Sequence, residues 1–386
     1  MKWINGTVMS MGGMQACGLT FEKTQYNGDE GGYYNPQLHS VVQIPICYTL
    51  IYSNESPGNA AEAPSAGEDT VVLLTGGPVG NSSSTLSLPS EVFPTSTTSC
   101  PIPSLPGPRI RYNHVMFATE EPSPRIIVCG GWDKDEIKHE SCLVLNLENQ
   151  RWDEITMLGQ ERRSFHAVVS VKNIGTYMIG GRMTGRTTNF LPPGSEQWVA
   201  GPANPVNMGR GPCALTITAN SFLAIYGRQI REYLIDTNNP TSDEGWEEAT
   251  KWPQLQIRRV YGLGCSKIKG KVVIAGGAGF EQITETSSSF GEILRSTEVL
   301  DLSTRKIEHA ENLATPRRTF HIVTITIDGF ERVFALAGYD DSYNYVDSVE
   351  EFDPYTLTWK PGPASLLVPR GRFGALVVPR NLICPV

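Results

Sequence analysis

Three histidines at recurring positions are the residues of this chain best suited to chemistry. His114, His166 and His321 each lie three residues after an arginine, in short runs that resemble one another. Imidazole is a common metal ligand, so such a set could bind a metal ion. A position that recurs along a chain is also typical of a packing role. We expect these histidines to be structural, with hydrogen bonds near a neighbouring repeat.

Arginines begin the same runs and their weaker copies. We expect most of them to form ion pairs between repeats, with recurring acids such as Asp301 and Asp353. The alternative is a ring of guanidinium groups that holds an anion, because a guanidinium presents several donors in one plane. The arginines are Arg111, Arg163, Arg210, Arg259, Arg318 and Arg372.

Several motifs of catalytic and metal sites are absent from the sequence. It contains no Gly-x-Ser-x-Gly elbow, no phosphate-binding loop and no His-Glu-x-x-His motif. Its eight cysteines include no Cys-x-x-Cys pair, so the spacing of a structural zinc site is missing. The net charge of −8 argues against nucleic acid or an anionic membrane surface as a partner. No apolar run approaches the length of a transmembrane helix. We therefore expect no metal, no cofactor and no membrane insertion.

Short β-strands must position these residues. Apolar residues recur with a period near two, and no helical stripe extends beyond about a turn. Many of these strands end in a glycine pair or a degraded pair, about every 50 residues. An acid or amide then precedes a bulky residue by six positions, as in Asn146 with Trp152 and Asp353 with Trp359. The pairs are Gly76-Gly77, Gly130-Gly131, Gly180-Gly181 and Gly276-Gly277, with Tyr226-Gly227 and Ala337-Gly338 as degraded copies.

These three markers in fixed order resemble the kelch repeat. The resemblance covers nearly the whole chain and implies an all-β, kelch-type β-propeller with four-stranded blades around a channel. Counting Gly12-Gly13 there are seven glycine-pair positions, so we predict seven blades, with six as the alternative if residues 1–43 form an appendage. We expect N- and C-terminal strands, residues 7–13 and 373–379, to pair and close the ring. One propeller domain would then span residues 1–386.

A copper-radical oxidase is the enzyme alternative, because galactose oxidase is also a kelch propeller. That family needs two histidines and two tyrosines at copper, with one tyrosine cross-linked to a cysteine. Here the neighbouring Tyr112 and His114 belong to the recurring run, and the ligand set cannot be matched residue by residue. We therefore expect a protein that is not an enzyme.

Possible glycosylation sites bear on the compartment of the protein. Asn5, Asn54 and Asn81 each begin an Asn-x-Ser/Thr motif and are candidate glycosylation sites. The segment 90–106 resembles the secreted kelch proteins of invertebrates. We therefore predict an extracellular, secreted protein, and a cytoplasmic location is the alternative.

The cysteines support the same expectation. Their even number permits disulfides, which persist in oxidising compartments. We predict at least one disulfide, at Cys100 or Cys142. The cysteines on expected strands, Cys129, Cys213 and Cys265 among them, are expected to be buried thiols.

The loops that follow the glycine pairs are the expected recognition elements. Each follows the same strand of its blade, so they should lie on one face of the propeller. We predict a non-catalytic binding or scaffold module that recognises a protein or glycan partner through this face; a fragment of an intracellular kelch substrate adaptor is the alternative. For Trp132 and Tyr339, packing beside a glycine pair is the alternative role. The candidate contact residues are Trp132, Arg182, Arg186, Phe280, Phe290, Tyr339, Tyr343 and Tyr345.

Overall fold

The computed structural model describes most of the chain after residue 68. The described residues are 69–77, 89–94, 102–106, 111–120, 124–133, 137–157, 159, 162–182, 184–280 and 291–383. The chain divides into two compact units, Met1–Glu55 and Ser56–Val386, and every described residue belongs to the second. A single domain over residues 1–386 therefore stays a prediction.

Antiparallel β-sheets make up the described part of the chain, as the strand pattern predicted. Four of them have four strands each, paired in chain order. The first comprises β3 (Val115–Thr119), β4 (Arg125–Cys129), β5 (Cys142–Asn146) and β6 (Arg151–Ile155). The second comprises β7 (Ala167–Val171), β8 (Gly175–Ile179), β9 (Thr188–Leu191) and β10 (Val199–Ala200). The others are β15 (Gly264–Ile268), β16 (Lys271–Ala275), β19 (Thr297–Asp301) and β20 (Lys306–Ala310), and then β21 (His321–Ile327), β22 (Phe330–Tyr339), β23 (Tyr345–Asp353) and β24 (Thr358–Pro361).

Three-stranded sheets complete the described topology, with little helix. One contains β11 (Cys213–Thr218), β12 (Ser221–Tyr226) and β13 (Gln229–Leu234), and another contains β25 (Gly374–Pro379), β1 (Thr70–Thr75) and β2 (Glu91–Phe93). A small sheet contains β14 (Arg258–Tyr261), β17 (Ala278–Phe280) and β18 (Glu292–Ile293). The helical turns are η1 (Asp243–Gly245), η2 (Ala249–Lys251) and α1 (Arg380–Ile383).

The turns between strands follow from residues that accept a left-handed backbone. Asp328 and Gly329, with φ angles of 52° and 76°, connect β21 to β22. Two successive positive φ angles suit a tight β-hairpin, because that turn matches the right-handed twist of its strands. An Asp-Gly pair is a typical residue choice for such a turn.

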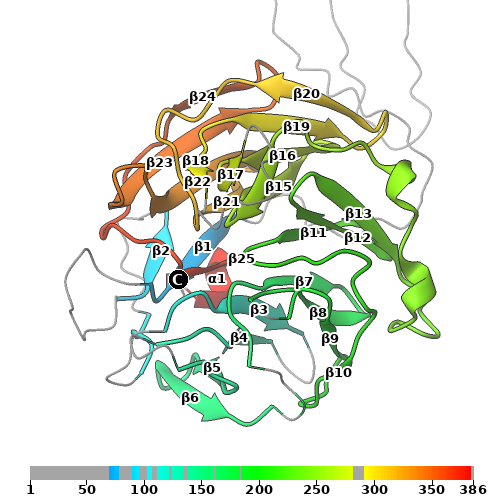
Figure 1. The fold of residues 1–386 in the computed structure, drawn as a ribbon. Coiled ribbons are helices and arrows are strands. Elements are labelled where there is room, and N and C mark those ends of the chain that lie inside the picture. Colours follow the sequence, from blue (N-terminus) through cyan, green and yellow to red (C-terminus); the bar gives the residue numbers. More distant parts are fainter. Residues whose placement is uncertain are drawn as a thin grey trace, which may run out of the picture. The chain divides into compact units, whose positions relative to one another are not determined.

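The innermost strands of the large sheets lie beside one another. They contact in the order β25, β3, β7, β11, β15 and β21, and β21 also contacts β25 and β1. Figure 1 shows these strands in the middle of the group, with β6, β10, β13, β20 and β24 on the outside. Apolar side chains of neighbouring sheets fill the space between them. Val273 and Ala275 of β16, for example, belong to one buried cluster with Ile322 of β21 and Val333 of β22.

A tryptophan on the outer strand, the bulky residue of the third sequence marker, seals neighbouring sheets against each other. Trp359 of β24 is buried in the layer between the β15 and β21 sheets. Its indole N–H donates to Thr297 Oγ1 at 3.0 Å, on β19 of the adjacent sheet. Trp152 of β6 packs against the β1 sheet and donates to the Pro103 carbonyl at 2.9 Å.

The C-terminal strand pairs with the strand that leads into Gly76-Gly77. β25 is antiparallel to β1 over its whole length, with Val377 opposite Val72. Strand β1 thus takes the place beside the C-terminal strand that the sequence assigned to residues 7–13. The predicted partner, residues 7–13, and the pair Gly12-Gly13 lie outside the described residues.

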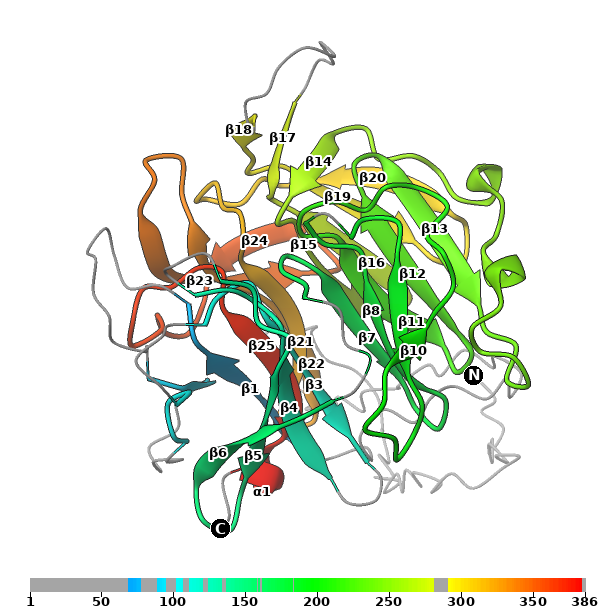
Figure 2. The ribbon, with the colours of Figure 1, turned by 60° about the horizontal axis from the view of Figure 1, so that its bottom comes forward.

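The insertion after Gly276-Gly277 was expected to be a loop, but part of it is strand. β17 and β18 pair with each other, and β17 pairs with β14. In Figure 2 the β17–β18 hairpin and the hairpin between β22 and β23 project on the same side of the sheets. Two of the segments expected to carry recognition residues therefore lie on one face.

Candidate binding site

The glycine pairs bring the end of one sheet against the beginning of the next. Gly276, at φ +60°, ends β16, and a Cβ on it would lie 2.4 Å from the Arg317 carbonyl oxygen and 2.6 Å from the Phe320 ring. A Cβ on Gly130 would lie 2.9 Å from the Arg163 carbonyl oxygen and 3.0 Å from the His166 ring. Only glycine fits both this backbone and this approach. The loop after each such pair therefore starts beside the first strand of the next sheet.

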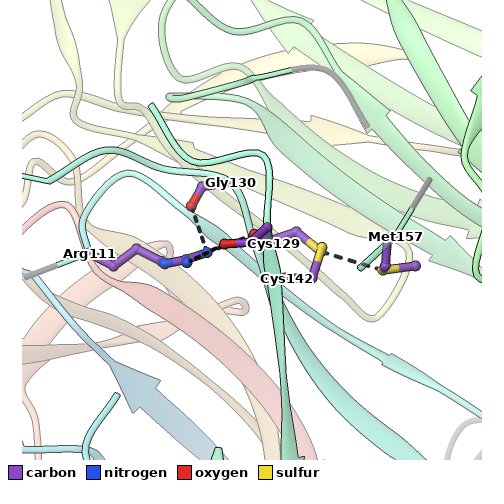
Figure 3. Close-up of a disulfide and its surroundings, with 6 residues drawn as sticks. Arg111, Cys129, Gly130, Cys142 and Met157 are labelled. Carbon is purple, nitrogen blue, oxygen red and sulfur yellow. Dashed lines mark hydrogen bonds between the residues drawn. A yellow bond between two sulfur atoms is a disulfide. The ribbon is translucent and has the colours of Figure 1, made fainter. Parts of the chain in front are cut away.

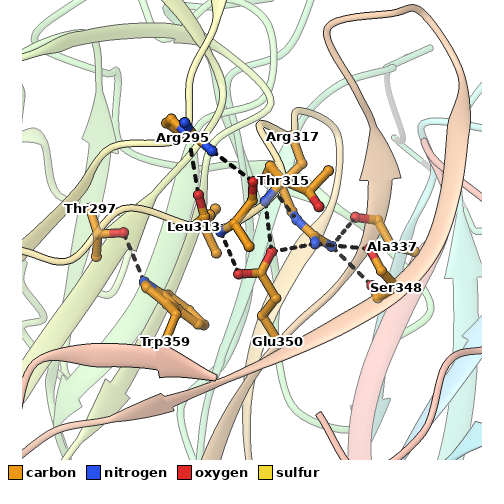
Figure 4. Close-up of polar contacts among 10 residues, drawn as sticks. Arg295, Thr297, Leu313, Thr315, Arg317, Ala337, Ser348, Glu350 and Trp359 are labelled. Atoms are coloured by element: carbon orange, nitrogen blue, oxygen red, sulfur yellow. Dashed lines mark hydrogen bonds and ion pairs between the residues drawn. The ribbon is translucent and has the colours of Figure 1, made fainter. Parts of the chain in front are cut away.

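Buried arginines bind the same junctions. Arg317 donates from Nη1 to the Ala337 and Ser348 carbonyls at 2.7 and 3.0 Å, and from Nη2 to Glu350 at 2.6 Å (Figure 4). Glu350 also accepts the backbone N–H groups of Ala314 and Thr315. Burial lowers the pKa of Arg317, and the Glu350 charge opposes that effect. The guanidinium thus joins the ends of two strands of one sheet to the linker that precedes it.

The ion pairs involve other acids than the sequence predicted. The buried pairs are Arg259 with Glu298 at 3.0 Å, Arg317 with Glu350 at 2.6 Å and Arg370 with Glu91 at 2.9 Å. Asp301 and Asp353, the expected partners, instead accept backbone N–H groups in the turns that follow their strands. An acid at a strand end caps its own turn, whereas Glu298 and Glu350, within β19 and β23, bind the arginine of the segment that precedes their own sheet.

Arg111 and Arg163 occupy the same position in sheets that lack this glutamate. Arg111 donates to the Gly130 and Ser141 carbonyls, and Arg163 donates to the Gly180 carbonyl and to Asn189 Oδ1 at 2.9 Å. The guanidinium therefore donates to backbone carbonyls in all of these sheets. In the sheets of Arg259 and Arg317 it also forms an ion pair with a glutamate.

Left-handed residues link the inner strands through their main chains. The Asn113 N–H donates to the Arg372 carbonyl at 2.7 Å, and Phe165 donates to Asn113 at 3.2 Å. On the other side, Arg372 donates to Thr319 at 3.0 Å, and Thr319 donates to Gly262 at 2.8 Å. Each residue of this series has a positive φ, which turns the chain into its first strand. We call the set the turning residues: Asn113, Phe165, Gly211, Gly262, Thr319 and Arg372.

The recurring histidines pack between sheets. His114 Nε2 lies 3.0 Å from Thr75 Oγ1, and His321 Nε2 lies 2.9 Å from the Phe373 carbonyl oxygen, in each case across a sheet boundary. Burial lowers the pKa of His166 to about 3, with a further contribution from the Arg163 charge. Burial also lowers the pKa of His114 and His321. The predicted hydrogen bonds to a neighbouring repeat are confirmed for His114 and His321.

Aromatic side chains from different sheets meet beside the turning residues. Trp132 lies 5.7 Å from Tyr112 and 5.5 Å from Phe165, and Phe165 lies 5.1 Å from Tyr261, between ring centroids. Trp132, Phe165 and Tyr261 are buried in this cluster together with Ala278. Their sheets begin with β3, β7 and β14, so residues distant in the sequence form one surface.

Arginines stack on the same aromatic rings. The Arg318 guanidinium carbon lies 5.0 Å from the Tyr261 and Tyr339 centroids and 5.8 Å from the Tyr343 centroid. Arg372 lies 5.9 Å from Tyr339 and 6.0 Å from Tyr112. Cation–π contacts hold a guanidinium by its face and leave its in-plane donors available.

These rings and arginines define what we call the mouth cluster. Arg182 joins it over Trp132 at 4.9 Å, and Arg210 joins it over Tyr261 at 6.0 Å. Tyr345 packs on Tyr339 at 5.0 Å. The cluster comprises Tyr112, Trp132, Phe165, Arg182, Arg210, Tyr261, Arg318, Tyr339, Tyr343, Tyr345 and Arg372.

The structure brings together five of the eight residues proposed from the sequence. Trp132, Arg182, Tyr339, Tyr343 and Tyr345 belong to the mouth cluster, and Tyr343 is 59% exposed. Arg186 is exposed, and no contact with the mouth cluster is found for it among the described residues. Phe290 and the side chain of Phe280 lie outside the described residues.

Other members of the mouth cluster were missed. Arg318 and Arg372 were recognised as recurring arginines but were expected to form ion pairs between repeats. The signal that distinguishes them is a second arginine just upstream. Arg317 precedes Arg318 by one residue and Arg370 precedes Arg372 by two, and these upstream arginines are the buried ones that form the ion pairs. Tyr112 and Tyr261 carry no comparable signal, because Tyr112 lies just before β3 and Tyr261 ends β14, outside the loops that follow the glycine pairs.

Two disulfides occur among the described residues. Cys129 of β4 lies directly opposite Cys142 of β5, and their sulfurs are 1.96 Å apart. Figure 3 shows this disulfide beside Arg111 and Met157. Cys213 and Cys265 join the inner strands β11 and β15 of neighbouring sheets, with sulfurs 1.86 Å apart. The prediction of a disulfide at Cys142 is confirmed, whereas Cys129, Cys213 and Cys265 are disulfide-bonded and not the expected free thiols; Cys100 lies outside the described residues.

Metal and membrane features were also sought in the described part of the chain. None of its groups of three or more His, Cys, Asp or Glu residues is placed to hold a metal ion. It contains no helix with the length and apolar character needed to cross a bilayer.

Comparison with known families finds one match. The family model of the Kelch motif matches residues 331–364, which include most of β22 and all of β23 and β24. No curated protein matches the chain in sequence. The all-β architecture with its four-stranded antiparallel sheets fits a kelch-type β-propeller.

Proposed function

We propose that this chain is a non-catalytic binding module that docks a protein partner at the mouth cluster. The Kelch motif supports an interaction role, because such repeats are generally interaction modules. Aromatic and arginine side chains are the usual anchors of protein interfaces, and here they gather on the face toward which two hairpins project. A glycan partner would use the same aromatic surface.

The observation that carries this proposal is the environment of Arg318. Its guanidinium lies among the rings of Tyr261, Tyr339 and Tyr343, only 8% of the residue is exposed, and its Nε makes no hydrogen bond among the described residues. No acidic side chain pairs with Arg318 or Arg372 in the described part of the chain. A buried cation without a counter-charge is costly, so a partner's carboxylate would stabilise it.

The net charge of the whole chain makes this site distinctive. The protein carries a formal charge of −8, yet arginines gather at the mouth cluster. Charge complementarity favours a partner that presents aspartate or glutamate side chains there, and it would also speed their association.

The scaffold that we propose for this site is a closed propeller of six blades. The cyclic order of contacts among the inner strands, the pairing of β25 with β1 and the hydrogen bonds between turning residues all support it. A seventh blade would have to come from residues outside the described ranges.

An extracellular location is part of the same proposal. Disulfides persist in oxidising compartments, and those at Cys129–Cys142 and Cys213–Cys265 are compatible with one. Glycosylation at Asn5, Asn54 and Asn81 remains a prediction, since these residues lie outside the described part of the chain.

Binding at the mouth cluster can be tested by partner capture. Arg372→Gln and the double change Arg318→Gln with Arg372→Gln should reduce capture of a cross-linked partner from native extract, and the double change more strongly. Arg162→Gln is the matched control, because Arg162 is an exposed arginine paired with Glu140. Asp328→Lys reverses a charge in the turn between β21 and β22, at the opposite ends of the strands, and tests whether a partner binds there. If the folded double variant captures the partner as well as the wild type and Asp328→Lys does not, the interface lies at the opposite ends of the strands and not at the mouth cluster.

A further inference from the structure

A cavity of about 590 Å³ lies between the inner strands. All six of the innermost strands contribute to its lining, together with the turning residues. It extends along β3 and β7 as far as Glu120 and Lys172, beyond the ends of these strands. Small-molecule sites typically have volumes of about 300 to 1,000 Å³, so this cavity has the size of a ligand pocket.

The wall of the cavity is largely apolar along its length. Ala118, Val168, Ala214 and Ala375 line it and are only partly buried, and Val377 is 36% exposed. Covering such accessible apolar side chains with an apolar ligand removes their surface from water, which favours binding.

Aromatic rings cover the end of the cavity that lies at the turning residues. Phe165 lines this end and packs against both Trp132 and Tyr261 of the mouth cluster. A ligand of the cavity would thus be separated from a partner at the mouth cluster and would reach its site from the other end of the strands.

Most of the lining polar atoms without partners lie at this covered end, and Thr119 Oγ1 is one at the other end. Asn113, His114 and His166 line the covered end and are 7%, 5% and 7% exposed. Among the described residues, no hydrogen bond is made by Asn113 Nδ2 or by either ring nitrogen of His166. Burial favours the neutral imidazole, which offers one donor and one acceptor. Buried groups of this kind are normally hydrogen-bonded, so they indicate a bound polar group.

We propose that the cavity is a binding site for an uncharged small molecule with an apolar ring or chain and a hydroxyl group at one end. The apolar part lies along Val168, Ala214 and Ala375, and the hydroxyl group meets His166 and Asn113.

Arg372 also lines the cavity, but its guanidinium stacks on Tyr112 and Tyr339 of the mouth cluster. A charged ligand is disfavoured because its charge would lose hydration beside neutral imidazoles and apolar walls. This site shares Phe165 and Arg372 with the mouth cluster but uses other atoms than the proposed partner interface.

A pair of fluorescent probes tests the ligand class on the full-length chain. 2-Naphthol is uncharged at neutral pH and carries one hydroxyl group, whereas naphthalene-2-sulfonate has the same ring with a charge. We expect saturable one-to-one binding of 2-naphthol and an affinity for the sulfonate that is weaker by about tenfold or more, or about 1.4 kcal/mol. Equal affinity for both probes, or no saturable binding of 2-naphthol, would overturn the proposal.

A matched pair of substitutions tests the location. Val377→Trp places a large ring in the cavity and should weaken 2-naphthol binding by about tenfold or more. Val199→Trp is the control, since Val199 is similarly exposed, at 38%, but lies on the outer strand β10. Equal losses in both variants, or none in Val377→Trp, would contradict a site in the cavity. Both positions are partly exposed, so both variants are expected to fold.

His166→Phe tests the polar end. It should weaken binding of 2-naphthol but leave binding of naphthalene, which lacks the hydroxyl group, unchanged. A change that is equal for the two probes would show that His166 does not meet the hydroxyl group and would remove that part of the assignment.

Discussion

Arg163 and Arg317 occupy the same structural position, although an alignment of the two similar sequence runs pairs Arg163 with the next residue, Arg318. Both side chains are fully buried, and both donate to the carbonyl of the first residue of a glycine pair or degraded pair, Gly180 or Ala337. Both also donate to a hydroxyl group, that of Thr187 or Ser348. By sequence, Glu-Arg-Arg-Ser-Phe-His and Pro-Arg-Arg-Thr-Phe-His align Arg163 with Arg318. The structure instead places Phe320 where His166 lies, each against a glycine pair.

The first prediction concerns the buried ion pairs. Glu350→Ala should lower the free energy of unfolding by about 3–5 kcal/mol, because it leaves Arg317 buried without its counter-charge. Urea denaturation monitored by tryptophan fluorescence would measure it. Glu331→Ala, an exposed change on β22, should stay within about 0.5 kcal/mol. A similar small effect of Glu350→Ala would show that the carbonyl acceptors alone satisfy Arg317.

The second prediction separates close approach from backbone conformation. Gly270 and Gly276 flank β16 with φ of +74° and +60°, but a Cβ on Gly270 would meet nothing within 4 Å. Gly270→Ala should therefore cost only the conformational strain, about 1–2 kcal/mol. Gly276→Ala should cost clearly more, or prevent folding, since its Cβ would overlap the Arg317 carbonyl. Equal melting temperatures of the two variants would argue against the observed packing of sheets.

The third prediction concerns the two disulfides. Mass spectrometry of protein alkylated without reduction should find a peptide with Cys129 linked to Cys142 and another with Cys213 linked to Cys265. On the chain-entropy estimate, reduction should cost about 3 kcal/mol for the shorter loop and about 4 kcal/mol for the longer one, with sequence separations of 13 and 52 residues. Free thiols at all four positions in freshly purified protein would contradict the assignment and weaken the case for an extracellular location.

The fourth prediction concerns pH. The folded pKa of His166 is about 3, below the ordinary value of 6.5, so the unfolded chain binds a proton that the folded protein does not. Stability should therefore be unaffected by this group above pH 6.5 and should fall as the pH drops from 6.5 toward 3, by up to about 1.4 kcal/mol per pH unit.

His166→Phe is the variant that tests this dependence. Phenylalanine already fills the equivalent position as Phe320. The variant should lose less stability than the wild type between pH 7 and pH 5, as measured by urea denaturation. His309→Phe is the control, because the His309 side chain is exposed. Parallel pH profiles of wild type and His166→Phe would refute the buried neutral state.

Much of the fold was predictable from sequence because its markers have local physical causes. A glycine pair is needed where two backbones approach, and Trp359 is needed where two sheets must be sealed, so both recur visibly. The projection of the β17–β18 and β22–β23 hairpins on one side followed from their common place after the second strand.

The roles of particular side chains were less predictable. Whether Arg317 or Arg318 is the buried arginine could not be read from the sequence, because the two similar runs align one residue away from the structural match. Only the packing of the side chains shows it. The pairing of Cys129 with Cys142 depends on how the segment between β4 and β5 returns, and that of Cys213 with Cys265 on which inner strands are neighbours. Phe165 reaches Tyr261 from another sheet, a contact that no spacing in the sequence encodes.

The hydrogen bonds between the turning residues have a consequence for how this protein can change. They are made by main-chain atoms alone, and asparagine, phenylalanine, glycine, threonine and arginine already serve there within one chain. At Asn113, Phe165, Thr319 and Arg372 the identity of the side chain is therefore decoupled from the hydrogen bond. A Cβ on Gly211 or Gly262 would instead lie 2.6 Å from the backbone of the next turning residue, so these two positions stay glycine. Positions such as Thr319 and Arg372 can be varied in combination, as in a binding library, to give the same scaffold a different specificity.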